Sequence, residues 1–152
     1  MRKIANAMSV AALVFATGAG AAEPEAFRGN VDKLTHQNND FRRVLFTGPN
    51  VQIVAMSLPQ KVDIGEEVHK VDQCFFFVDG KAETIVNGKT ARMSEDGVLC
   101  VPAGARHNIR NAGSAPLKLY TLYAPPQHPA GTVHHTKADA ERAEKAEHQP
   151  KK

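Results

Sequence analysis

The middle of the chain alternates short apolar runs with turn residues, and no helical period competes with this pattern. Strand-like runs rich in β-branched and aromatic residues fall within 41–50, 51–60, 65–80, 81–93, 97–104, 107–113 and 117–125. The strongest turn signal is Asn87-Gly88, which predicts a β-hairpin inside 81–93. About eight short strands at regular spacing predict an all-β sandwich or barrel.

Polar residues interrupt the third of these runs at every second position. Side chains alternate between the two faces of a strand, so Glu67, His69 and Gln73 are expected on one face, together with Phe75. Burying three polar groups without partners is costly, so this face is expected to bind something. Taken alone, each of these residues also has a plain interpretation, as a surface acid, a packed histidine or ordinary core.

The first 22 residues are typical of an export signal. Arg2 and Lys3 give a basic start, 7–16 is an apolar run, and 19–22 offers small residues for cleavage. The apolar run is too short to favour a spanning helix, although an uncleaved anchor is the alternative. Cleavage after Ala22 predicts a periplasmic or secreted protein of roughly 130 residues, one domain in size, without stable membrane association.

Charge and composition limit the kinds of partner molecule that the protein is expected to bind. The chain has 19 Lys and Arg against 16 Asp and Glu, a small excess that shrinks further once the signal is removed. No basic patch interleaved with aromatic residues occurs, so nucleic acid is not an expected partner. Residues 23–40 form a polar lead-in, and 127–152 form a polar tail. Within the tail, 138–148 is rich in alanine and charge and predicts a short solvated helix.

A second polar cluster lies in 102–111, where a Pro-Gly turn precedes His107 at the start of a strand. Histidine, carboxylate and amide oxygen together form a ligand set for a divalent metal ion. Residues this far apart converge only if the sheet closes on itself, as it does in a small barrel.

Together these residues resemble the two motifs of the cupin superfamily. The first motif is matched in spacing, with Glu67 in the place of a histidine and Gln73 in that of a glutamate; its members are Glu67, His69, Gln73 and Gly80. The second motif is matched by a proline, a glycine, a histidine and an asparagine: Pro102, Gly104, His107 and Asn111. The resemblance implies an all-β fold, the double-stranded β-helix or jelly-roll cupin barrel, over 41–126.

The resemblance also implies a site and a function. The four ligands carried over are Glu67, His69, Gln73 and His107, around a divalent ion that could be iron, manganese, nickel or zinc. Glu67 is also the candidate catalytic base. The expected protein is a mononuclear metalloenzyme of dioxygenase or isomerase type acting on a small oxygenated molecule. The alternative function is a non-catalytic ligand-binding module with a structural metal. A homodimer is a possible assembly.

Two cysteines bear on the strand arrangement. In cupins the strand after the first motif runs antiparallel beside the strand that opens the second, which brings Cys74 close to Cys100 on the face away from the ligands. A disulfide is then geometrically accessible and suits an exported protein. Two buried small hydrophobic residues are the alternative.

Other polar residues remain open. For His128, His134 and His135 a solvated tail is favoured over a lid or a second metal site, because no acid or cysteine accompanies them at ligand spacing. Arg42 with its neighbouring arginine is interpreted as an edge-strand device rather than a substrate contact. Of the two tyrosines in 117–125, Tyr120 is expected to reach the barrel interior.

Overall fold

The computed structural model describes residues 25–147, and the predicted export signal lies outside them. Within this part the chain forms nine strands and two helices. In order these are α1 (Val31–Gln37), β1 (Arg42–Thr47), β2 (Gln52–Leu58), β3 (Asp72–Asp79), β4 (Lys81–Val86), β5 (Lys89–Ser94), β6 (Val98–Val101), β7 (His107–Asn111), β8 (Leu117–Ala124), β9 (Val133–His134) and α2 (Lys137–Glu147). The all-β prediction is confirmed.

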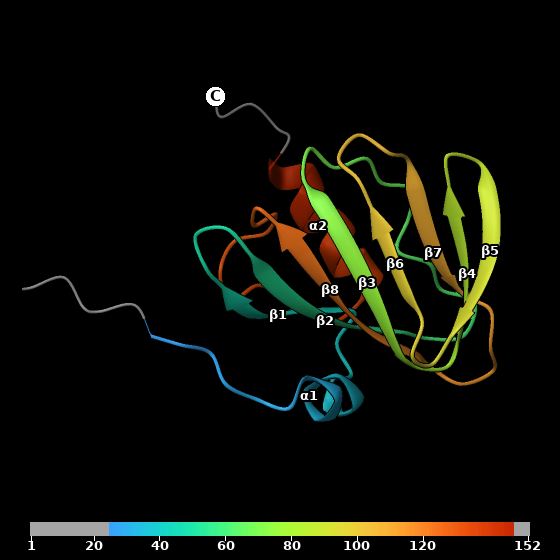
Figure 1. The fold of residues 1–152 in the computed structure, drawn as a ribbon, viewed down its shortest axis with the longest axis horizontal. Coiled ribbons are helices and arrows are strands. Elements are labelled where there is room, and N and C mark those ends of the chain that lie inside the picture. The colour runs from blue at the N-terminus through green and yellow to red at the C-terminus, as the bar shows by residue number, and fades with distance from the viewer. Residues whose placement is uncertain (1–24, 148–152) are drawn as a thin grey trace, which may run out of the picture.

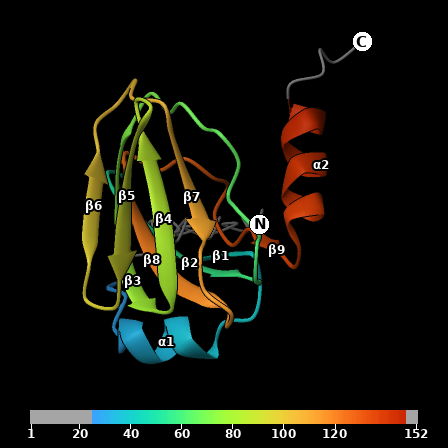
Figure 2. The same ribbon diagram turned by 90° about the vertical axis from the view of Figure 1, so that its right-hand side faces the viewer.

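The strands form two antiparallel sheets packed as a sandwich. The larger sheet has the order β6-β3-β8-β2-β1-β9, and the smaller has the order β5-β4-β7. Figure 1 shows β4, β5 and β7 grouped at one side, beyond the β3 and β6 end of the larger sheet. Figures 1 and 2 both place α1 below the strands.

The core lies between the inward faces of the strands. Along β3, residues Gln73, Phe75 and Phe77 are buried while Asp72 is exposed and Cys74 and Phe76 are half-buried, which is the alternation expected of a strand with one face toward the core. The fully buried apolar residues are Val54, Ala55, Leu58, Phe75, Ile109, Leu117 and Leu119. Burial of the valine, leucine, isoleucine and phenylalanine side chains among them contributes about 1.5–3 kcal/mol each.

Two turns depend on backbone conformations that glycine supplies. Asn87 and Gly88 both have positive φ, at 47° and 77°, so the predicted hairpin between β4 and β5 is confirmed. Gly80 joins β3 to β4 with φ 96°, and an added Cβ would lie 3.1 Å from the Cα of Leu117. A side chain there would be strained and would press on β8.

Cys74 and Cys100 are direct partners in the antiparallel pairing of β3 with β6, and they form a disulfide. Both neighbours of Cys74, Gln73 and Phe75, are buried, so the cysteine points away from the core face. Of the two alternatives that the sequence left open for these cysteines, the structure has the disulfide, and it fixes β6 against β3.

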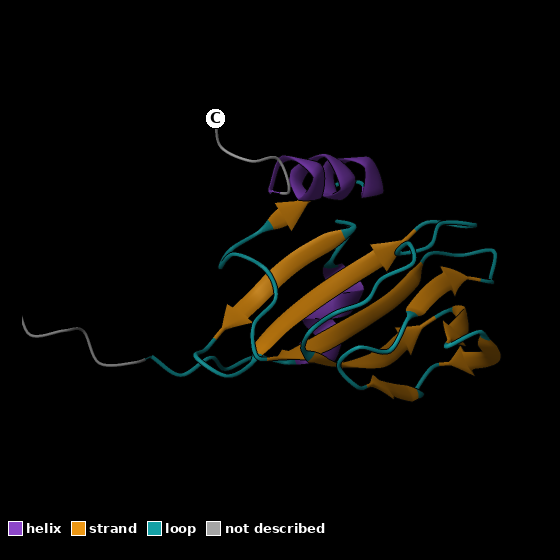
Figure 3. Ribbon diagram, turned by 90° about the horizontal axis from the view of Figure 1, so that it is seen from above, coloured by secondary structure: helices purple, strands orange, loops and turns teal. Residues whose placement is uncertain are grey.

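The C-terminal segment packs on the sandwich, so the prediction of a solvated tail is wrong for His128 and His134, which are half-buried, whereas His135 is exposed as predicted. β9 adds to the edge of the larger sheet by pairing with β1. Gln52, fully buried in β2, donates to the backbone oxygen of His128 at 2.7 Å. Figure 3, seen from above, shows α2 beside β9 at one margin of the molecule.

Helix α2 meets the sandwich through a few residues. Ala140 is buried against the core, Glu144 pairs with Arg42 of β1, and Lys137 pairs with Asp63. The prediction of a helix in this segment is confirmed. One face of the helix, however, packs against the sandwich rather than facing solvent. Neither helix of the described chain is long and apolar enough to span a membrane.

Candidate metal centre

Glu67 and His69 lie in the loop 59–71 that connects β2 to β3, not in the strand that the sequence pattern predicted. β3 begins only at Asp72. The loop is nevertheless extended and held against the smaller sheet: Glu67 exchanges two backbone hydrogen bonds of 2.9 Å with His107, and Gly104 donates to the oxygen of His69 at 2.8 Å. Isolated bridges replace a continuous ladder here.

The alternation of faces survives in this loop. Glu66, Val68 and Lys70 are exposed, whereas Glu67 and His69 are half-buried and point inward. The shared face that the sequence predicted for Glu67, His69 and Gln73 is therefore present, although the strand assignment for the first two was wrong.

His107 and Gln73 come from the two sheets. His107 opens β7 after a tight turn, in which Gly104 has φ 84° and Ala105 donates to the oxygen of Pro102 at 3.1 Å. Gln73 is the second residue of β3. Both side chains are almost fully buried, at 2% and 1% exposure.

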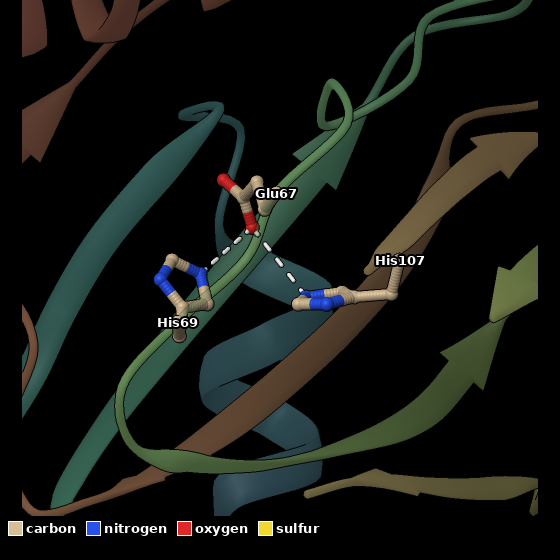
Figure 4. A group of neighbouring side chains, drawn as sticks. All are labelled: Glu67, His69 and His107. Carbon is tan, nitrogen blue, oxygen red and sulfur yellow. Dashed lines mark hydrogen bonds and ion pairs between the residues drawn. The ribbon is translucent and has the colours of Figure 1, made fainter. Parts of the chain in front are cut away.

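The four side chains converge on one point. The Nε2 atom of His69 lies 3.0 Å from Oε2 of Glu67, and Nε2 of His107 lies 3.7 Å from the same oxygen. Figure 4 shows Glu67 between the two imidazoles. Oε1 of Gln73 is 3.0 Å from Nε2 of His107. One ligand atom each from Glu67, His69 and His107 lie within 4.8 Å of one another.

The tautomer of His107 makes this cluster a good fit for a cation. Its Nδ1 faces the backbone oxygen of Ala105 at 3.0 Å, and an oxygen can only accept, so Nδ1 carries the hydrogen. The Nε2 of His107 then faces two oxygens, Oε1 of Gln73 at 3.0 Å and Oε2 of Glu67 at 3.7 Å. A metal ion placed among these three atoms would be coordinated by all of them.

Three further residues border the centre and were not predicted from the sequence. Arg42 is 2% exposed, and its Nη2 lies 3.6 Å from Oε1 of Glu67, so the edge-strand interpretation is wrong for this arginine. The ring of Tyr123 meets that of His69 edge-on at 5.6 Å, and the ring of His128 meets Tyr123 edge-on at 5.1 Å.

The prediction for the two tyrosines is also wrong. Tyr123 is 1% exposed and lies opposite Gln73, whereas Tyr120 faces outward and stacks on Phe76 at 4.8 Å. The inward positions of β8 are the odd-numbered ones, as the burial of Leu119 and Thr121 shows. Counting alternate positions forward from Leu117 would have placed Tyr123 inside.

Burial shapes the protonation of two groups near the centre. Desolvation, and next the charge of Glu67, raise the pKa of Tyr123 well above its usual value, so the phenol keeps its proton. Desolvation lowers the pKa of His128 to about 3, helped by the charges of Arg42 and His69. His128 is therefore a neutral imidazole at ordinary pH.

Asn111, the last residue of the second motif, has a structural role. Its amide donates to the backbone oxygens of Leu58 at 2.9 Å and Ala115 at 2.8 Å, and its oxygen accepts from Gly113 at 2.8 Å. Both polar atoms of its side chain are thereby used in fixing the chain around the end of β7.

Comparison with known proteins decides the family. The family model described as Cupin domain matches residues 54–123. The chain is 45% identical over 129 residues to the uncharacterized protein YrkC of Bacillus subtilis, covering 80% of this chain and 69% of that protein. The chain belongs to the cupin family.

The chain is also similar to two further proteins. The chain is 36% identical to the uncharacterized protein L612 of Acanthamoeba polyphaga mimivirus, with 68% of each chain covered. The crystal structure of BH2720 from Bacillus halodurans superposes with a TM-score of 0.77 at 40% identity, covering 79% of this chain and 96% of that one. The cupin fold predicted from the motifs is confirmed.

Proposed function

We propose that this cupin is a mononuclear metal-dependent enzyme, of dioxygenase or isomerase type, that acts on a small oxygenated molecule. The observation that carries the proposal is the convergence of Glu67 Oε2, His69 Nε2, His107 Nε2 and Gln73 Oε1 on one buried point. A divalent cation placed among these atoms would be coordinated by two imidazoles, a carboxylate and an amide oxygen.

The donor set favours a metal of intermediate hardness. Two imidazoles, one carboxylate and one amide oxygen suit iron, manganese, nickel or zinc, and the absence of a thiolate among these four donors disfavours softer ions. Glu67 is the one anionic donor, so a divalent ion would leave the set with a net positive charge. Such a centre would favour an oxygen-bearing ligand with partial or full negative charge.

The surrounding residues would prepare that ligand for reaction. A bound divalent metal would act as a Lewis acid toward a carbonyl or enediol oxygen. Glu67 would hold or accept the proton that the ligand loses, since its carboxylate is the base at the centre. Tyr123 keeps its phenolic proton and is a hydrogen-bond donor there, while the buried ring of Phe75 beside His107 excludes water.

The test begins with protein made without a metal-chelating tag. We expect mass spectrometry to find about one equivalent of a first-row divalent metal per chain. Oxygen uptake and isomer formation would then be measured with small enediol and phenolic compounds. Glu67→Gln should keep the fold and lose turnover; Glu66→Gln, at an exposed neighbouring acid, is the matched control.

Two outcomes would contradict the proposal. Protein without metal after purification and reconstitution would remove the centre. Metal-loaded protein that binds such compounds but turns none over would favour the second candidate, a non-catalytic binding module with a structural metal. The crowding of the centre by Arg42 and Tyr123 is compatible with that candidate.

We also propose that the protein is exported, to the periplasm or beyond. The disulfide between Cys74 and Cys100 supports this, because such bonds persist mainly in oxidising compartments. Cell fractionation should place the protein outside the cytoplasm, with its mature N-terminus near residue 23. A full-length chain found in the cytoplasm with both thiols reduced would contradict it.

A further inference from the structure

Arg42 is a buried charge held between two carboxylates. It is 2% exposed, with Nη1 2.9 Å from Oε1 of Glu144 and Nη2 3.6 Å from Oε1 of Glu67. Its Nε is buried and has no hydrogen-bond partner within residues 25–147. A buried guanidinium needs a counter-charge, and here only the contact with Glu144 has hydrogen-bond length.

Glu67 is a poor permanent partner for this arginine. Its other oxygen, Oε2, faces His69 and His107 and belongs to the candidate metal centre. A carboxylate that serves a metal with one oxygen gives up part of its charge to that ion. Neutralisation of Arg42 therefore falls mainly to Glu144, a residue of the C-terminal helix 102 positions away.

The helix that carries Glu144 is held by few contacts. α2 has 11 residues with the sequence KADAERAEKAE, in which Ala140 is the residue buried in the core. The Glu144 side chain is 46% exposed, and the ion pair between Lys137 and Asp63 holds the opposite end. An isolated helix of this length is marginal in water, so release of α2 requires the loss of little packing.

We propose that Arg42 is the anion-binding group of the active site, that the ligand is a small carboxylate, and that Glu144 occupies the carboxylate position until the ligand displaces it. This inference rests on the proposed function in one respect: a second oxygen of the ligand would face the metal centre, on the other side of Glu67 from Arg42. A carboxylate that takes the place of Glu144 meets the end of the guanidinium, where Nη1 and Nη2 lie side by side and can give the paired hydrogen bonds that a guanidinium fork favours. Helix α2 then acts as a lid: it is closed while Glu144 pairs with Arg42, and it opens when the ligand carboxylate takes the place of Glu144.

Binding of malonate to metal-reconstituted protein tests this inference by isothermal titration calorimetry, with malonamide as the neutral analogue. Removing the competitor by Glu144→Gln should tighten malonate binding by about tenfold. Glu141→Gln is the matched control, because Glu141 lies on the same helix, loses the same charge, and pairs with Lys137 at 3.9 Å rather than with Arg42. Arg42→Lys keeps the charge but loses the fork, and should weaken malonate binding by about tenfold. Malonamide should bind to none of them.

Hydrogen–deuterium exchange supplies a readout that does not depend on turnover. Malonate should speed amide exchange over 137–147 in the unaltered protein, because the helix is displaced, and should leave exchange in β3 and β8 unchanged. Equal malonate affinity in the unaltered, Glu144→Gln and Glu141→Gln proteins, or exchange in α2 that malonate does not alter, would overturn the inference.

Metal content of the same samples separates the two proposals. Protein that holds no metal but still gains malonate affinity on Glu144→Gln would keep the anion site and refute the metal centre. Protein that holds metal and shows no such gain would keep the centre and refute the role of Arg42 and Glu144.

Discussion

Replacing the buried amide of Gln73 with a carboxylate probes the metal centre most directly. Gln73→Glu changes an amide nitrogen into an oxygen with almost no change in shape, so packing is preserved. The native Nε2 is buried and has no hydrogen-bond partner within the described residues 25–147, and Oε1 lies 3.0 Å from His107 Nε2. Without metal, the new carboxylate would share the site with Glu67 and lack water, so it should be destabilising.

The size of that effect has an upper bound. A buried carboxyl can avoid carrying a charge by taking up a proton. At pH 7, which is roughly 2.7 units above the ordinary pKa of glutamate, protonation costs about 1.36 kcal/mol per unit, or about 3.7 kcal/mol in all. A folded region of about 120 residues has an unfolding entropy of about 0.25 kcal/mol/K. The metal-free variant should therefore melt up to about 15 °C below the unaltered protein.

Bound metal should offset the loss of stability in Gln73→Glu. A carboxylate is a stronger ligand than an amide oxygen, so a saturating divalent metal should raise the melting temperature of Gln73→Glu more than that of the unaltered protein. Gln73→Leu is the matched control. It removes the orphan amide without adding charge, so it should change metal-free stability little and lose much of the metal response.

Differential scanning calorimetry after dialysis against a chelator, and again with excess metal, measures both effects. If metal-free Gln73→Glu melts within about 3 °C of the unaltered protein, and metal shifts all three proteins equally, Gln73 does not face a cation site. Loss of the cooperative transition in Gln73→Glu at every metal concentration would also contradict the expected rescue.

Three further outcomes follow from named contacts. His69→Ala and His107→Ala should each lower metal content at least tenfold by mass spectrometry, whereas His36→Ala, on the exposed side of α1, should not; equal occupancy in all three would refute the ligand assignment. Reducing the disulfide between β3 and β6, which closes a span of 26 residues, should lower the free energy of unfolding by about 3.5 kcal/mol in chemical denaturation, and an unchanged midpoint would contradict this. Because the folded pKa of His128 is lowered to about 3, the metal-free folded state takes up fewer protons than the unfolded state below about pH 6.5. The free energy of unfolding should then fall by up to about 1.4 kcal/mol per unit as pH drops toward 3, and His128→Asn should flatten that slope in denaturant titrations.

The sequence predicted the ligand face because alternation is a local property. Glu67 and His69 lie outside a regular strand, yet an extended backbone alternates its side chains whether or not it has a full hydrogen-bonded partner. The positions of Gln73 and His107 followed in the same way from β3 and β7. Alternation does not predict which of these residues meet across the sandwich; the spacing of the two motifs did.

The residues that the sequence did not place are those whose partners are distant. Arg42 and Glu144 are 102 positions apart, and nothing in the charge-rich sequence of α2 distinguishes Glu144 from its acidic neighbours. The burial of His128 depends on Gln52, which holds the chain after β8 against β2. Such contacts are fixed by how the tail docks, and composition alone favours solvent for a segment with so few large apolar residues.

Charge balance connects the lid to the selection of ligand. Arg42, Glu67 and Glu144 together carry one positive and two negative charges, and a divalent ion would bring this group to a net charge of plus one. In the proposed exchange, a ligand carboxylate replaces the Glu144 carboxylate, so the net charge stays the same. A neutral ligand would displace Glu144 without replacing its charge and would leave the guanidinium unpaired in a dry site, which is costly. The cupin would therefore reject neutral molecules of the same shape through an arginine that touches only one end of the ligand.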